Sequence, residues 1–302
     1  MRLFWYNPNI GQYVRELVLH VNWIPGKQNR NSVDAGNIQI LTQTPFVEKL
    51  SIRGSIHPPT SWNSLQPTLQ QPILNPIHST SLTELSIYNF VIPITIFRSF
   101  ANPSALRINQ VKDSGQTEPI DQASMSPCSP QPMTIPQLRS FELNKSSDAF
   151  ALALVNYRDS DDHALIRFDE LKTLIVHEME TLVIKDICKE AIRLETFACT
   201  EITEATRWPD FRRFSTLKTL KGQCINGQFS EDLLLGLCEK LPMFPQPNVL
   251  ETLDIEIKIV SGSWHNISIS ARNEWGQLDM VLSRGFPRLY RVSISVVFLS
   301  TR

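Results

Sequence analysis

The chain has 302 residues, of which 42% are hydrophobic and 20% charged, and its formal net charge is −1. This composition excludes a chain that is disordered throughout. Without a basic excess, the sequence predicts no nucleic-acid binding.

No apolar stretch reaches the length that spans a membrane, and the N-terminal apolar run is too short for a signal peptide. We therefore expect no membrane association. The five cysteines form an odd set without C-x-x-C spacing, which is typical of reduced thiols. These features predict a cytoplasmic or nuclear protein.

One short phrase recurs along the chain: an apolar residue, two further residues, a second apolar residue, one residue, and a third apolar residue. The ten copies begin at Val14, Val47, Leu82, Pro103, Leu138, Leu171, Leu194, Leu217, Leu250 and Leu289. Their spacing is uneven, between 21 and 39 residues. Only Pro103 and Gly222 break the apolar rule, so each copy predicts a strand.

In a strand, the second and third apolar residues of each phrase point to one face and their neighbours to the other. The neighbours are mostly polar; the aliphatic exceptions are Val18, Ala105, Ile175 and Ala198. Repeated alternation of this kind predicts a sheet that is buried on one face and wet on the other.

Several segments between the phrases have helical patterns. They are residues 148–157, residues 181–192, a helix capped by Ser230 and running to Leu241, a helix from Asn273 to Leu282, and a short helix opened by Pro93. Strands joined through helices imply parallel pairing and right-handed crossovers. The predicted fold is α/β: a single solenoid over residues 1–302, with a parallel concave β-sheet and convex helices.

Residues 112–137 are rich in Ser, Pro and Gln and predict a disordered insertion in this solenoid. Residues 57–80 share that composition. Strand phrases continue on both sides of each stretch, so we expect one interrupted array rather than two domains.

The phrases that begin at Leu82 and Leu250 look like the L-x-x-L-x-L strand signature of leucine-rich repeats. The long irregular units, and the segment Tyr13 to Leu17, further resemble the repeat region of fungal F-box/leucine-rich-repeat proteins. The resemblance implies an irregular leucine-rich-repeat solenoid that binds another protein, as the substrate-recognition part of a ubiquitin-ligase adaptor. Two features depart from the family: the Asn or Cys ladder after the strand is mostly absent, and no F-box precedes residue 13. Ubiquitin-ligase components are therefore expected partners only if an F-box is restored.

Motifs for catalysis and metal binding are missing from the sequence. There is no H-E-x-x-H helix, no P-loop and no G-x-S-x-G elbow, and the acidic run from Asp159 to Asp162 lacks the Gly and Glu of a calcium loop. We expect a protein that is not an enzyme and needs neither cofactor nor metal.

The wet face of the sheet is then the predicted functional surface, with a protein as the expected partner. The predicted contact residues are Lys49, Arg53, Tyr88, Arg107, Glu142, His177 and Lys221. Two alternatives remain open: a parallel β-helix enzyme that acts on carbohydrate, and a gene fragment without function.

Overall fold

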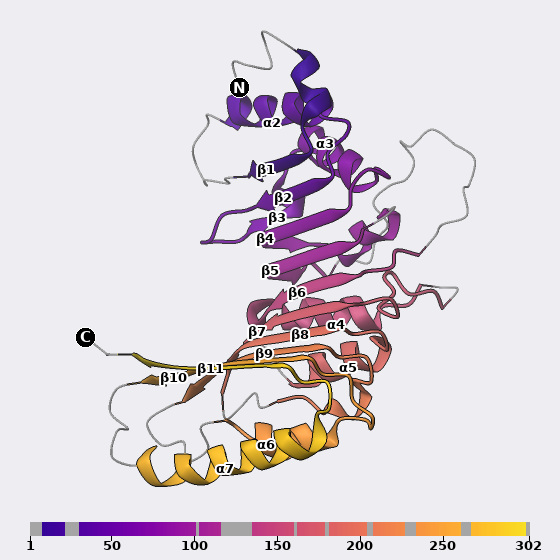
Figure 1. The fold of residues 1–302 in the computed structure, drawn as a ribbon. Coiled ribbons are helices and arrows are strands. Elements are labelled where there is room, and N and C mark those ends of the chain that lie inside the picture. Colours follow the sequence, from indigo (N-terminus) through magenta and orange to yellow (C-terminus); the bar gives the residue numbers. More distant parts are fainter. Residues whose placement is uncertain are drawn as a thin grey trace. The chain divides into compact units, whose positions relative to one another are not determined.

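The computed structural model describes residues 8–21, 30–100, 103–115, 135–159, 162–178, 181–203, 208–226, 234–260 and 267–299. The chain forms two compact units, and both combine a parallel β-sheet with helices. Unit 1 comprises Met1–Leu138 and Ser146–Arg167, and unit 2 comprises Arg139–Lys145 and Phe168–Arg302. Figure 1 shows the strands within each unit lying side by side in chain order.

Unit 1 contains strands β1 to β5 and the helices that connect them, together with α4. Its elements are η1 (Pro8–Tyr13), β1 (Glu16–His20), α2 (Arg30–Gln43), β2 (Lys49–Arg53), β3 (Thr60–Ser61), η2 (Trp62–Ser64), α3 (Pro67–Ile77), β4 (Glu84–Ile92), η3 (Ile94–Ser99), β5 (Ala105–Asp113) and α4 (Asp148–Asn156). The short turn η5 (Lys145–Ser147) leads into α4. The strands pair in the order β1, β2, β4, β5, and β3 adds to β4.

Unit 2 contains the remaining strands and helices. Its elements are β6 (Ser140–Asn144), β7 (Thr173–His177), α5 (Thr181–Glu190), β8 (Thr196–Ile202), η6 (Phe211–Arg213), β9 (Thr219–Asn226), α6 (Leu237–Lys240), η7 (Leu241–Met243), β10 (Thr252–Val260), α7 (Ile267–Gly285) and β11 (Arg291–Leu299). Its strands pair from β6 to β11 in sequence order, all parallel.

All ten strand phrases form strands, and the phrase also sets the register. Leu17 lies opposite Leu50, Leu50 opposite Leu85, and Leu85 opposite Leu106. Matching phrase positions therefore stack across the sheet, although the connecting segments differ in length. A strand shifted by one residue would turn its apolar side chains towards water, which explains why the phrase determines the register.

Eight of the described strands also begin in the same way. One backbone carbonyl accepts hydrogen bonds from two consecutive N–H groups of the next strand: Glu48 O accepts from Thr83 and Glu84, and Lys172 O from Glu195 and Thr196. The carbonyls of Arg15, Thr83, Arg139, Glu195, Lys218 and Glu251 make the same pair of bonds. Units 1 and 2 thus contain the same repeated backbone hydrogen bonds, although the strand phrases are unevenly spaced in the sequence.

The predicted alternation of buried and exposed positions is present in the sheets. Leu50 and Ile52 of β2 are 1% and 2% exposed, whereas Lys49 and Arg53 beside them are exposed. Apolar helix residues, such as Leu69, Ile73 and Ile77 of α3, are buried as well, and α4 packs against β5. One face of each sheet therefore contributes to the core, and the other carries the polar side chains.

Strands β4 and β11 depart from this alternation. Ser86 is predicted to face solvent but is 5% exposed, in register between Ser51 and Arg107. On β11, Val292 and Ile294 stay partly exposed, and among the described strands β11 pairs only with β10.

The helix predictions for residues 148–157 and 181–192 match α4 and α5 closely. The segment opened by Pro93 forms the 3-10 helix η3. Helix α7 contains the predicted segment from Asn273 to Leu282 but is longer at both ends, running from Ile267 to Gly285. The residues from Ile267 to Asn273 include no Gly or Pro to stop it.

Of the helix predicted from Ser230 to Leu241, the structure confirms only the last part, α6 (Leu237–Lys240), and it shows a turn at residues 234–236. Helix α6 has four residues and is preceded by Leu235 and Gly236, both with positive φ, of 49° and 81°. Left-handed backbone at consecutive positions cannot continue a right-handed helix. Ser230 itself lies outside the described residues.

Helices α2 and α3 are not predicted by the sequence patterns. Helix α3 lies within the Pro-rich stretch 57–80, and it begins at Pro67, where a missing N–H costs nothing. Leu69, Ile73 and Ile77 supply a buried stripe at a spacing of four residues. A composition typical of loops therefore conceals an amphipathic helix.

The predicted insertion at 112–137 is ordered at both described margins. Lys112 and Asp113 are the last residues of β5, and Gln137 forms a parallel bridge with Arg167. Residues 116–134 lie outside the described residues. No helix in the described part of the chain is long and apolar enough to cross a membrane.

Candidate functional site: the polar sheet face

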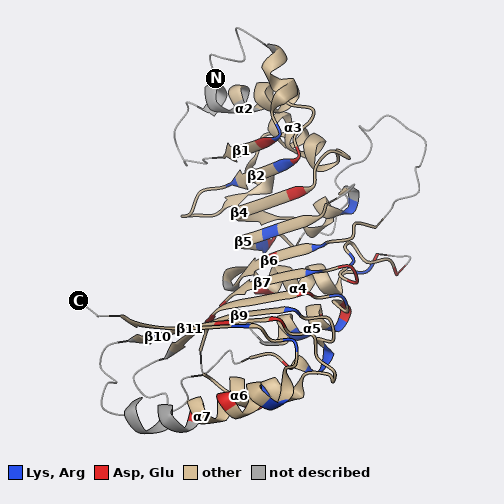
Figure 2. Ribbon diagram, in the orientation of Figure 1, with Lys and Arg blue, Asp and Glu red and all other residues tan. Residues whose placement is uncertain are grey.

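Four predicted contact residues lie on the polar face of the unit 1 sheet. Lys49 and Arg53 belong to β2, Tyr88 to β4 and Arg107 to β5. Since alternate residues of a strand share a face, the register places Lys49 opposite Glu84 and Arg53 opposite Tyr88. Figure 2 shows charged segments on the neighbouring strands β2, β4 and β5.

Glu84 joins two of these cations. Its Oε2 lies 3.6 Å from Lys49 Nζ, and its Oε1 lies 3.0 Å from Arg107 Nη2. The Glu84 side chain is 19% exposed, against 55% for Lys49 and 47% for Arg107. One half-buried carboxylate thus orients two exposed cations on neighbouring strands.

Arg53 packs on an aromatic ring. Its guanidinium carbon lies 5.2 Å from the centroid of Tyr88, within the range of a cation–π contact. Its Nε also donates to Ser51 Oγ at 3.5 Å. Two contacts therefore restrain a long exposed side chain, which reduces the entropy it would lose on binding a partner.

The other three predicted residues lie in unit 2. His177 Nε2 is 3.5 Å from Glu142 Oε1, and His177 Nδ1 is 2.6 Å from Thr200 Oγ1. The structure therefore brings His177 and Glu142 together. Lys221 of β9 is exposed and lies in register between Ala198 and Asp254, so it does not join that pair.

Two carboxyl groups beside His177 are missed by the sequence analysis. A hydrogen bond with Glu178 raises the pKa of Glu201, helped by desolvation and by repulsion between the two charges, while Lys258 and His177 lower it. Both residues have positive φ, 49° at Glu178 and 61° at Glu201. Glu178 directly follows His177, and Glu201 directly follows Thr200, and both glutamates have left-handed backbone. The alternation of buried and exposed residues along a regular strand therefore could not predict that their side chains meet.

A row of uncharged residues begins strands β6 to β10 of unit 2. Thr173, Thr196, Thr219 and Thr252 lie opposite one another in register, with Ser140 beside Thr173. This part of the polar face offers hydroxyl groups, in contrast to the paired charges of unit 1.

No group of three His, Cys, Asp or Glu side chains that could hold a metal ion occurs among the described residues. The geometry on this face is that of ion pairs, a cation–π contact and hydroxyl groups. Such groups recognise the charge pattern of a partner and fix its orientation.

The chain matches no protein-family model, no curated protein and no solved structure. The likeness to fungal F-box/leucine-rich-repeat proteins therefore stays a prediction from the strand phrases.

Proposed function

We propose that the chain is a protein-interaction module of the leucine-rich-repeat type, a solenoid that binds a partner protein on the polar face of its sheet. The observation that best supports this proposal is made on unit 1, where Arg53 stacks on Tyr88 and Arg107 pairs with Glu84. Arg and Tyr are enriched among the residues that dominate binding energy at interfaces.

The rigidity of the strands supports this proposal. The opposite face of β4 and β5 is closely packed, with Leu85 and Leu106 both 0% exposed. The recurring hydrogen bonds at the strand starts hold neighbouring strands in register. Contact residues on such strands keep their positions before the partner arrives, which lowers the cost of binding.

The helices between the strands oppose the carbohydrate-active alternative. A parallel β-helix predicts mostly strand with regular coils, whereas α2, α3, α4, α5 and α7 each cover two turns or more. A far-UV circular dichroism spectrum without helical bands would favour that alternative. Cooperative thermal unfolding of the purified chain would count against a fragment that cannot fold.

The proposal predicts that Arg53→Ala and Arg107→Ala each weaken partner binding by about 1–2 kcal/mol, roughly 5–30-fold, without lowering the thermal midpoint. The partner is first identified by proximity labelling with the wild-type chain, and its affinity for each variant is then measured by interferometry.

The matched control is Arg193→Ala, which also removes an exposed, ion-paired arginine, since Arg193 Nη1 lies 2.7 Å from Glu170 Oε2. Its affinity should equal that of the wild type. Equal affinity for all three variants would show that the partner binds elsewhere. Glu142, His177 and Lys221 are then the next residues to replace.

The narrower proposal, a substrate-recognition part of a ubiquitin-ligase adaptor, is supported by the sequence resemblance alone. Mapping the 5′ end of the natural transcript tests it. An in-frame F-box ahead of Met1 would support the role, and a transcript that starts at Met1 would remove it.

A further inference from the structure

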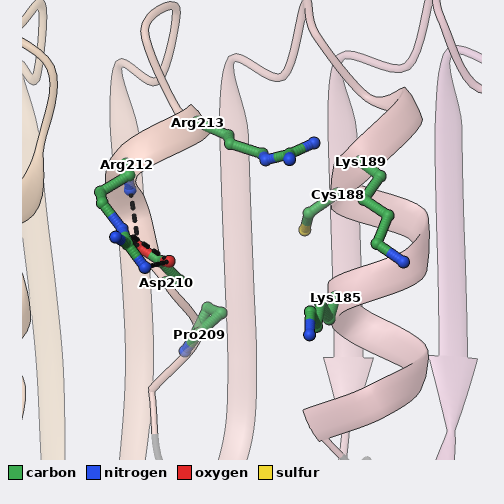
Figure 3. A pocket seen from close by; sticks show the side chains of 7 residues that line it. All are labelled: Lys185, Cys188, Lys189, Pro209, Asp210, Arg212 and Arg213. Atoms are coloured by element: carbon green, nitrogen blue, oxygen red, sulfur yellow. Dashed lines mark hydrogen bonds and ion pairs between the residues drawn. The ribbon is translucent and has the colours of Figure 1, made fainter.

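Unit 2 contains a pocket of about 490 Å³ between helix α5 and the segment that enters η6. The lining residues are Lys185, Cys188, Lys189, Pro209, Asp210, Arg212 and Arg213. Figure 3 shows Lys185, Cys188 and Lys189 on the helix and the other four residues across the space from it. None of them belongs to the polar sheet face described above.

Buried apolar side chains hold both walls. Helix α5 buries Val183, Ile184 and Ile187. On the other side, Phe211 is 0% exposed and its ring packs against Trp208 and Phe214. The cationic side chains therefore project from backbone that the core keeps in place.

The charges that line the pocket do not balance. Arg212 and Asp210 form a paired contact in which Arg212 Nε donates to both carboxylate oxygens, at 2.9 and 2.8 Å. The hydrogen bonds from Arg212 lower the pKa of Asp210, so this carboxylate stays ionised and matched. Lys189 Nζ is likewise paired with Asp186 Oδ1, at 2.5 Å.

Two cations remain for a ligand. Within the described part of the chain, the structure gives no hydrogen bond or ion pair to the ammonium of Lys185 or the guanidinium of Arg213. Figure 3 shows Arg213 extending across the space towards helix α5. Burial raises the pKa of Cys188 to about 12, so its sulfur stays protonated and adds no negative charge.

We propose that this pocket binds a phosphate monoester, with the dianion between Lys185 and Arg213. A phosphate monoester carries about −1.5 to −2 charges at neutral pH, which matches the two unpaired cations. A guanidinium forms two parallel hydrogen bonds to phosphate oxygens, and a lysine ammonium adds a point charge. The volume lies within the range of about 300–1,000 Å³ that is usual for small-ligand sites, so there is room for more than the phosphate alone.

The test is calorimetric titration of the full chain with three probes: inorganic phosphate, O-phosphoserine, and a short peptide that contains phosphoserine. We expect saturable binding of O-phosphoserine that weakens as salt is added. Binding should also weaken about severalfold from pH 7 to pH 5, because the second phosphate pKa is about 6.

Arg213→Gln and Lys185→Gln should each raise the dissociation constant about tenfold or more, because each removes a charged hydrogen bond to the anion. Arg193→Gln is the control, and its binding should equal that of the wild type. Both pocket side chains are exposed, so the variants should unfold at the wild-type temperature, which a thermal scan verifies.

The probes distinguish two sources of the phosphate group, a phosphorylated protein and a small phosphorylated molecule. Tighter binding of the phosphopeptide than of O-phosphoserine assigns the pocket to a phosphorylated protein, and the reverse order assigns it to a small phosphorylated molecule. Either order supports the proposal. It is overturned if no probe binds saturably, or if the two pocket variants bind as well as the wild type.

Discussion

Gly222 occupies a place in strand β9 where the strand phrase calls for an apolar residue. A Cβ built on it would lie 2.0 Å from a ring carbon of Trp208. Trp208 cannot move away easily, since it is 2% exposed and its Nε1 donates to Leu234 O at 2.9 Å. The break in the phrase thus marks the place where the indole packs against the backbone of the sheet.

Gly222→Ala is therefore expected to destabilise the chain by about 1–3 kcal/mol, the usual cost of overpacking a core. Urea unfolding followed by Trp fluorescence measures it. The control is Gly276→Ala in helix α7, where a Cβ meets open space. That change should stabilise the helix by up to about 1 kcal/mol. Equal effects at both sites would contradict the packing argument.

The contact between Glu178 and Glu201 makes the stability of the folded chain depend on pH. Hydrogen bonding and repulsion from Glu178 raise the pKa of Glu201 above its ordinary value of 4.5. The folded state then holds the Glu201 proton more tightly than the unfolded state does. The stabilisation from this proton is complete below pH 4.5 and is lost as the pH rises through the raised pKa.

Glu178→Gln should remove this loss, because an amide can donate a hydrogen bond to ionised Glu201 and carries no charge. Relative to the wild type, the variant should gain stability as the pH rises above 4.5. Urea unfolding at several pH values from 4 to 8 gives the two profiles. Glu239→Gln, an exposed glutamate of α6, is the control and should follow the wild-type profile. Parallel profiles for all three proteins would refute the link.

At the scale of the element, one backbone feature recurs at the same place in four strands. Asn89, Gln110, Glu178 and Glu201 have φ between 49° and 61°. Each stands two residues after the last apolar residue of its strand phrase. Where β4 pairs with β5, Tyr88 lies opposite Asn109, and the next pair is Phe90 and Val111. The left-handed residues Asn89 and Gln110 lie between these pairs, one on each strand, as bulges in register.

The bulge changes which side chains enter the core. After Asn89, Phe90 is 1% exposed, although simple alternation from Ile87 would direct it to the polar face. Phe90 of β4, Val111 of β5 and Ile202 of β8 each follow a left-handed residue and are buried.

Left-handed backbone costs a residue with a Cβ about 1–2 kcal/mol, and Gly is free of this cost but loses about 0.5–1 kcal/mol of chain entropy. Gln110→Gly should therefore stabilise the chain by about 0.5–1 kcal/mol in urea unfolding. Lys112→Gly, further along β5, has no such strain to relieve and should destabilise it by about 0.5–1 kcal/mol. Loss of stability in both variants would mean that Gln110 is not strained.

At the scale of the whole molecule, the chain divides into two compact units with the same strand design. The polar faces of these sheets differ in chemistry. Unit 1 carries Lys49 and Arg107 paired with Glu84, and Arg53 stacked on Tyr88, whereas unit 2 carries the threonine row and the carboxyl groups of Glu178 and Glu201. The polar faces of the two units therefore present different chemical groups.

The sequence by itself determined the ten strands, their parallel order and their register. It could do so because the apolar phrase has a period of two and because a slip of one residue would expose the core. Lys49, Arg53, Tyr88 and Arg107 were also placed correctly on the polar face of unit 1 by the same alternation.

Only the tertiary structure decided which of those residues interact. Glu84, Thr200 and the pair Glu178 and Glu201 acquire their roles through contacts between strands that are distant in sequence. The pocket on unit 2 likewise joins α5 to residues 209–213. The short apolar phrase encodes the alternation of side chains along one strand. The distances between side chains on different elements depend on loop lengths and on residues with left-handed backbone, and the phrase contains neither.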